Sequence, residues 1–168
     1  MTKPREHLLH WLRDAYAMEK QALEMCQRQV ERIENYPELR QRIALHVVET
    51  KDQIRKLDQC FAILDEKPSA VKSAIGWTMG NVQAASGMLV ADEIVKGSMA
   101  SYVFENLEIA SYTILIAAAE KANEPEIARI CETIRDQEQE MADWLKDHLP
   151  GTTTQFMQRD ASEKRARV

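Results

Sequence analysis

Four glutamates lie within long amphipathic segments, where a helical bundle normally buries apolar side chains: Glu19, Glu49, Glu108 and Glu138. The first two are 30 residues apart, and so are the last two. A carboxylate in a dry core is unfavourable unless a cation or hydrogen-bond donors compensate its charge. Four carboxylates converging from four helices are the arrangement by which a bundle holds two metal ions. The pattern therefore predicts a di-metal carboxylate site.

The residues that flank each glutamate indicate whether its side chain points into the bundle. Glu138 has only apolar residues at the flanking positions on its face: Ile130, Ile134, Met141 and Leu145. Glu19 and Glu108 are also flanked by core-type residues. Tyr16 and Tyr112 each lie one turn from one of these two acids, either as core residues or as partners of the ligands. The alternative for each glutamate is an edge position with its charge paired to a lysine or arginine.

Nitrogen ligands are scarce in this pattern. Carboxylate oxygens with one or two nitrogens suit iron or manganese. Bundles of this kind usually place a histidine three residues after a glutamate, but neither Glu49 nor Glu138 has one there. The candidates that remain beside Glu49 are His46, three residues before it, and Gln53, four residues after it. His46 is either a ligand, a partner of a ligand or a structural residue. Glu105 is a further candidate ligand.

Four long helices are expected to carry these residues. The apolar periodicity predicts helices over residues 4–34, 37–64, 92–123 and 125–148. Pro37 and Pro125 suit the first turn of a helix. Each follows a break of only one or two residues, so each pair of helices must form an antiparallel hairpin.

The connection between the two hairpins is long. Residues 65–92 form a crossover, and we expect a short helix within residues 70–88. A crossover of this length is needed only if the helices it joins run in the same direction, as in ferritin-like bundles. Pro150 and Gly151 are expected to end the fourth long helix. A last short helix over residues 152–160 completes a single domain of residues 1–160, and residues 161–168 form a disordered tail.

Length and composition limit the class of protein. The chain has 168 residues, enough for one domain with one sizeable core. A net charge of −5 argues against nucleic-acid binding. We expect no membrane span and no signal peptide, because no apolar run is long enough. Three widely spaced cysteines indicate buried thiols in a reducing cytoplasm: Cys26, Cys60 and Cys131.

Six segments taken together carry a family pattern: Trp11–Gln21, His46–Ile54, Asp92–Ser98, Tyr102–Glu105, Glu108–Tyr112 and Glu138–Leu145. In these segments the chain resembles the YciE/YciF family of ferritin-like proteins, and the YciE branch most of all. The resemblance implies an all-α, rubrerythrin-like four-helix bundle that is homodimeric, lies in the bacterial cytoplasm and takes part in stress responses.

The resemblance also implies the ligands of a di-metal site. The family's bundle-core acids correspond to Glu19, Glu49, Glu108 and Glu138, and His46 and Gln53 flank the second of these. The family often has two adjacent acids in the fourth long helix, whereas this chain has Gln137 before Glu138.

Two functions follow from these patterns. The first is a di-iron or di-manganese protein that handles iron, oxygen or peroxide, with an oxidase, ferroxidase or peroxide-consuming activity as the candidate reaction. The second is a non-catalytic helical stress protein that binds partners and has an empty or vestigial metal site.

Overall fold

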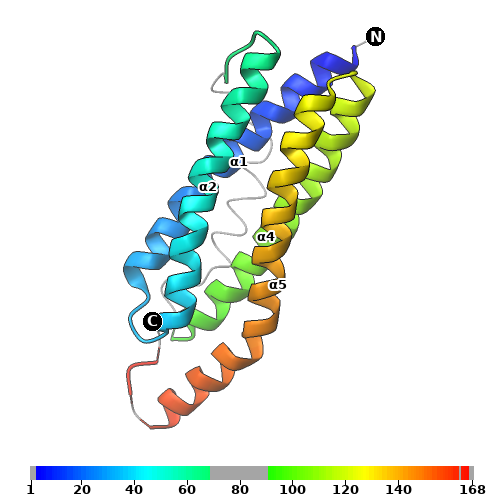
Figure 1. The fold of residues 1–168 in the computed structure, drawn as a ribbon. Coiled ribbons are helices and arrows are strands. Elements are labelled where there is room, and N and C mark those ends of the chain that lie inside the picture. The colour runs from blue at the N-terminus through cyan, green and yellow to red at the C-terminus, as the bar shows by residue number, and fades with distance from the viewer. Residues whose placement is uncertain (1–2, 69–90, 163, 167–168) are drawn as a thin grey trace.

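The protein is a bundle of four long helices in the computed structural model, which describes residues 3–68, 91–162 and 164–166. The helices are α1 (Pro4–Arg32), α2 (Pro37–Ile63), α4 (Glu93–Lys121) and α5 (Pro125–Ala161) (Figure 1). These described residues contain no strand, so the predicted all-α class is confirmed. The short helix predicted within residues 70–88 lies outside the described residues.

Local sequence explains where the helices begin and end. Pro4, Pro37 and Pro125 each occupy the first turn of a helix, where a missing N–H group leaves no hydrogen bond unmade. Asp65 and Asn123 follow α2 and α4 with φ angles of 53° and 62°. Aspartate and asparagine tolerate this left-handed conformation, which turns the chain away from the helix axis.

The helices form two antiparallel hairpins, α1 with α2 and α4 with α5. Across the hairpins, α1 packs beside α4 and α2 beside α5. Figure 1 shows α2 and α4 running in the same direction, so that α4 begins at the end of the bundle opposite to the end of α2. This is the single-crossover, ferritin-like topology that the sequence predicted.

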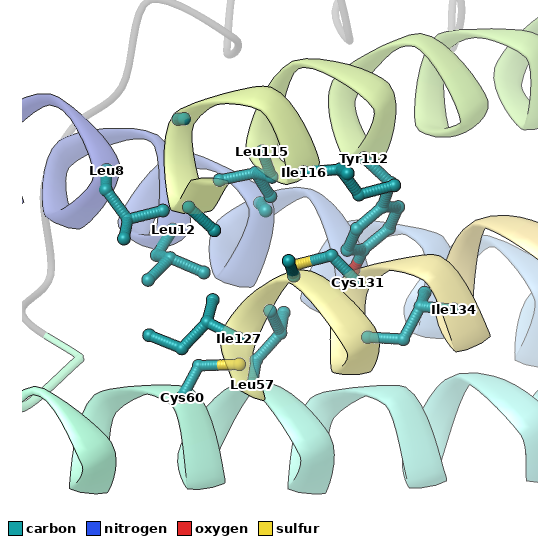
Figure 2. Close-up of a cluster of buried hydrophobic side chains, with 14 of the residues drawn as sticks. Leu8, Leu12, Leu57, Cys60, Tyr112, Leu115, Ile116, Ile127, Cys131 and Ile134 are labelled. Carbon is teal, nitrogen blue, oxygen red and sulfur yellow. The ribbon is translucent and has the colours of Figure 1, made fainter. Parts of the chain in front are cut away.

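Apolar side chains fill the bundle in two separate clusters. The cluster around Leu12, Leu57, Leu115 and Ile127 draws on all four helices (Figure 2). The second cluster lies towards the α1–α2 turn and includes Cys26, Ile33, Tyr36, Leu39, Ile43, Ile94, Met141 and Leu145. On α2 and α5 the candidate ligands lie between the two clusters, whereas on α1 and α4 they lie among residues of the first cluster.

The predicted end of the fourth long helix at Pro150 is wrong. α5 is one helix through Pro150 to Ala161, and it includes the residues 152–160 expected as a separate helix. Figure 1 shows its last part bending towards the α1–α2 turn. Proline removes one hydrogen bond and crowds the preceding turn, which bends a helix without always ending it.

Tertiary contacts hold the bent part of α5 in place. Gln155 donates a hydrogen bond to the backbone carbonyl of Asn35 at 3.1 Å, and Arg159 donates one to the side chain of Asn35 at 2.6 Å. Phe156 packs on the second apolar cluster. Asn35 lies far from Pro150 in sequence, which is why local sequence signals did not predict these contacts.

The residues after α5 lie back against the α1–α2 turn. Arg165 forms an ion pair with Glu34 at 2.9 Å, and the Tyr36 hydroxyl donates a hydrogen bond to the carbonyl of Ala166. The domain division at residue 160 and the disorder of residues 161–168 stay predictions. Within the described ranges, no helix combines the length and hydropathy needed to span a membrane.

Candidate metal centre

A layer of buried polar side chains lies within the bundle. Each helix contributes at least one member, and each member is at most 1% exposed: Glu19 from α1, His46, Thr50 and Gln53 from α2, Glu105 and Glu108 from α4, and Glu138 from α5. Helical periodicity explains the grouping, because residues three, four and seven apart share a face. The buried polar residues of each helix therefore point into the bundle and meet in one layer.

Four of these residues form a compact group. His46, Glu105, Glu108 and Glu138 each offer one ligand atom, and these atoms all lie within 4.8 Å of one another. The Nε2 atom of His46 lies 3.3 Å from a carboxylate oxygen of Glu105 and 3.5 Å from one of Glu138. The group joins three helices at one point and could hold a metal ion.

Glu19 is the buried acid of α1. One of its oxygens accepts a hydrogen bond from the hydroxyl of Tyr112 on α4, and the other has no hydrogen-bond partner within the described structure. Burial raises the pKa of Glu19 to about 7, although the hydrogen bond from Tyr112 lowers it. Glu19 therefore has one oxygen held by the protein and one that remains available to a cation.

Glu49 is placed differently from the other three predicted acids. Its side chain is 20% exposed, and one carboxylate oxygen lies 2.8 Å from Nδ1 of His46 and 3.1 Å from the guanidinium of Arg42. Burial alone would raise the pKa of Glu49, but these two partners outweigh it and lower that pKa. The structure thus places Glu49 behind the imidazole, outside the compact group.

The buried carboxylates lack the hydrogen bonds that such groups normally make. Within the described structure, both oxygens of Glu108, both of Glu138 and one of Glu105 have no hydrogen-bond partner, and the same holds for the amide oxygen of Gln53. Burial, together with the neighbouring carboxylates, raises the pKa of Glu108 and of Glu138 well above the usual value. Orphaned oxygens facing one another are costly in a protein core unless a cation binds them.

The donor set fits a metal centre. Glu19, Glu105, Glu108 and Glu138 would carry four negative charges when ionised, equal to the charge of two divalent cations. His46 adds one imidazole nitrogen. Oxygen-rich sets with an imidazole suit iron and manganese better than metals that prefer thiolates. The buried cysteines are free thiols and do not belong to the compact group.

Five of the six predicted ligands lie in the layer, and Glu49 lies outside it. The layer contains Glu19, Glu108, Glu138 and His46, as well as Gln53, whose amide donates to Gln137 at 3.3 Å. Glu105, a further candidate from the sequence, belongs to the compact group.

The sequence did not single out Arg42 as a partner of Glu49. The only signal for that contact was the spacing of seven residues, which is two helical turns.

Three solved structures share the fold of this chain. A protein from Xanthomonas campestris is 41% identical, with a TM-score of 0.81 over 95% of this chain and 99% of its own. YcfI from Rhodopseudomonas palustris is 30% identical, with a TM-score of 0.77 over 86% of this chain and 94% of its own. The E. coli stress protein YciF is 22% identical, with a TM-score of 0.80 over 89% and 96%.

The family follows from the extent of the match. Residues 3–158 match the family described as a domain of unknown function, DUF892. The likeness to YciF agrees with the resemblance to YciE and YciF that the sequence motifs indicated. The chain therefore belongs to the DUF892 family of YciE/YciF-type proteins.

Proposed function

We propose that the protein is a ferritin-like di-metal carboxylate protein that binds two iron or manganese ions and handles iron, oxygen or peroxide under stress. The observation that supports this most directly is the group of His46, Glu105, Glu108 and Glu138 with its orphaned carboxylate oxygens. The name of one structural relative, a stress protein, supports the link to stress.

The side chains of the layer would divide the work of holding the ions. Glu108 and Glu138 have both oxygens free of hydrogen bonds, so both oxygens of each would be available to hold the cations. Glu19 and Glu105 would each offer one such oxygen. Two bound iron or manganese ions would supply one- and two-electron chemistry towards oxygen or peroxide. The apolar clusters next to the layer would keep bulk water from the ions.

We further infer that the protein acts in the bacterial cytoplasm as a homodimer. Three buried free thiols suit a reducing compartment. The relatives with solved structures named above come from bacteria. Size-exclusion chromatography with light scattering tests the dimer, since a monomeric mass would contradict it.

The alternative is a non-catalytic stress protein that binds partners and leaves this site without metal. One observation favours it: the imidazole of His46 lies within ion-pairing distance of Glu105 and Glu138, so a protonated histidine can offset part of their charge. In that case metal would not change the melting temperature of the protein.

Elemental analysis distinguishes the two functions. Protein purified without added metal is analysed, then analysed again after anaerobic loading with Fe(II) or with Mn(II). We expect about two ions per chain, by the arrangement known for such bundles. The variant with Glu108→Ala and Glu138→Ala should bind none and should retain its helical circular dichroism.

A matched control removes two exposed acids from the same helices. The variant with Glu120→Ala and Glu140→Ala should bind as much metal as the wild type. No metal in the wild type under any of these conditions would exclude the di-metal function and leave the partner-binding alternative.

A further inference from the structure

His46 and Glu49 lie three residues apart on α2 and are in contact, but only His46 faces the compact group. His46 is 1% exposed, with Nε2 facing Glu105 and Glu138. Its other ring nitrogen, Nδ1, lies 2.8 Å from the carboxylate of Glu49. The imidazole thus stands between the buried group and Glu49, with one nitrogen turned to each.

A second contact fixes the carboxylate of Glu49. Arg42 lies 3.1 Å from the same oxygen that contacts His46, and the Arg42 side chain is itself only 12% exposed. Turning Glu49 into the compact group would take its carboxylate away from a largely buried guanidinium. A guanidinium separated from its carboxylate in such surroundings is costly. These charges therefore hold Glu49 away from the compact group.

We propose that Glu49 is a positioning residue for His46 and does not coordinate metal. This inference rests on the proposed function. Glu49 accepts the Nδ1–H of the imidazole, which leaves Nε2 free of a proton when a cation is bound and keeps the ring aimed at the group. Carboxylates in this role set the tautomer and orientation of histidine ligands in many metalloproteins.

The proposal changes the expected ligand set. α2 then supplies one nitrogen in place of the carboxylate that the even spacing of acids suggested. Glu105 supplies the missing carboxylate from α4, where it lies one turn before Glu108 and is equally buried. The site is therefore asymmetric, with two acids from α4 and one each from α1 and α5.

Two substitutions separate positioning from coordination. Glu49→Gln retains an oxygen that can accept the Nδ1–H, whereas Glu49→Ala removes it. Anaerobic Fe(II) titration of both variants gives the number of bound ions and their affinity. We expect an unchanged number in both, an affinity about 10- to 100-fold weaker in Glu49→Ala, and a loss of less than about threefold in Glu49→Gln. Asp58→Asn is the matched control, because it removes one exposed charge from α2.

A spectroscopic measurement tests the geometry without metal. The Nδ1 proton of His46 should give an imidazole N–H signal protected from exchange with water in ¹⁵N-resolved NMR, assigned by its loss in His46→Gln. The signal should persist in Glu49→Gln and disappear in Glu49→Ala. The melting temperature of each metal-free variant shows whether a change in affinity comes from unfolding.

Each outcome decides a separate point. Fewer bound ions in Glu49→Gln would make Glu49 a ligand and overturn the proposal. A wild-type protein without the protected Nδ1 proton would also overturn it. A wild-type protein that shows this proton but binds no metal would overturn both the proposed function and the role of Glu49 in positioning a metal ligand. The hydrogen bond would then serve only the fold.

Discussion

The hydroxyl of Tyr112 on α4 donates a hydrogen bond to the carboxylate of Glu19 on α1. Both side chains are fully buried, and burial next to this carboxylate raises the pKa of Tyr112 well above its ordinary value. The tyrosine therefore stays protonated at physiological pH and can donate to the ionised carboxylate. This bond connects the two hairpins at the level of the candidate metal centre.

Removing the Tyr112 hydroxyl should destabilise the protein. Tyr112→Phe leaves a buried oxygen of Glu19 without its donor, which costs about 1–3 kcal/mol in the free energy of unfolding at neutral pH. Urea denaturation followed by circular dichroism measures this loss. Tyr16→Phe is the control, because the Tyr16 ring packs edge-on against Phe61 and its hydroxyl makes no such contact with the buried acids. Equal losses in the two variants would show that the bond to Glu19 does not contribute.

Metal-free protein should be more stable at pH 5.5 than at pH 8. Burial raises the pKa of Glu19 to about 7 and those of Glu108 and Glu138 well above their usual value. Groups whose pKa is higher in the folded state bind more protons there. Their contribution is complete below the unfolded pKa of about 4.3 and is lost as pH rises through the folded values.

Two neighbours modify this pH dependence. Burial alone would lower the pKa of His46, but Glu105 and Glu49 raise it to about 9, so its contribution is also lost as pH rises. Glu49 has a lowered pKa, and its contribution is lost only in acid, below its usual value of 4.5. Melting temperatures of metal-free protein between pH 5.5 and 8 test the sign. A melting temperature that rises over this interval would contradict the burial of the acids.

Replacing one buried acid should stabilise the metal-free protein while weakening metal binding. Glu108→Gln removes a carboxylate whose two oxygens have no partner, and we expect a gain of about 1–3 kcal/mol at pH 8. Urea denaturation with chelator, alongside Fe(II) titration, measures both effects. Glu120→Gln changes an exposed acid of the same helix and should affect neither. A loss of stability in Glu108→Gln would mean that its carboxylate is compensated without metal.

The bent part of α5 should loosen when Arg159 is removed. Arg159 donates hydrogen bonds to the Asn35 side chain at 2.6 Å and to the carbonyl of Arg165 at 2.9 Å. Arg159→Ala should speed amide hydrogen exchange in residues 152–166 at least tenfold, since a loss of about 1.4 kcal/mol is a factor of ten. Exchange near the candidate metal centre should not change. Lys146→Ala, before the bend, is the control.

Sequence periodicity predicted the helices, their hairpins and the buried positions of Glu19, Glu108 and Glu138. It predicted these acids well because core residues flank them on both sides. Glu49 shows the limit of this reasoning. Its neighbours Leu45 and Val48 are apolar, yet they are 54% and 62% exposed. The orientation of α2 about its own axis places His46 inward and Glu49 beside it. Packing against the other helices sets this orientation, which the sequence of α2 alone does not reveal.

The continuity of α5 through Pro150 shows a second limit. Local rules predict a helix end there, because proline cannot donate the expected hydrogen bond. The helix continues because Gln155, Phe156 and Arg159 gain contacts with the distant α1–α2 turn. Hydroxyl groups in this part also bond back to the helix, as Thr154 does to the carbonyl of Pro150 at 2.9 Å. The contacts with the α1–α2 turn depend on the complete fold and leave no local signal.

The polar layer draws side chains from all four helices, and this has a consequence for folding kinetics. Each hairpin can form from contacts near in sequence, but the layer exists only after α1 and α2 have docked on α4 and α5. A cation that binds this layer would stabilise interactions formed late, after the transition state. It should therefore slow unfolding much more than it speeds folding. Bound metal would then keep the two hairpins docked and prolong the lifetime of the folded chain.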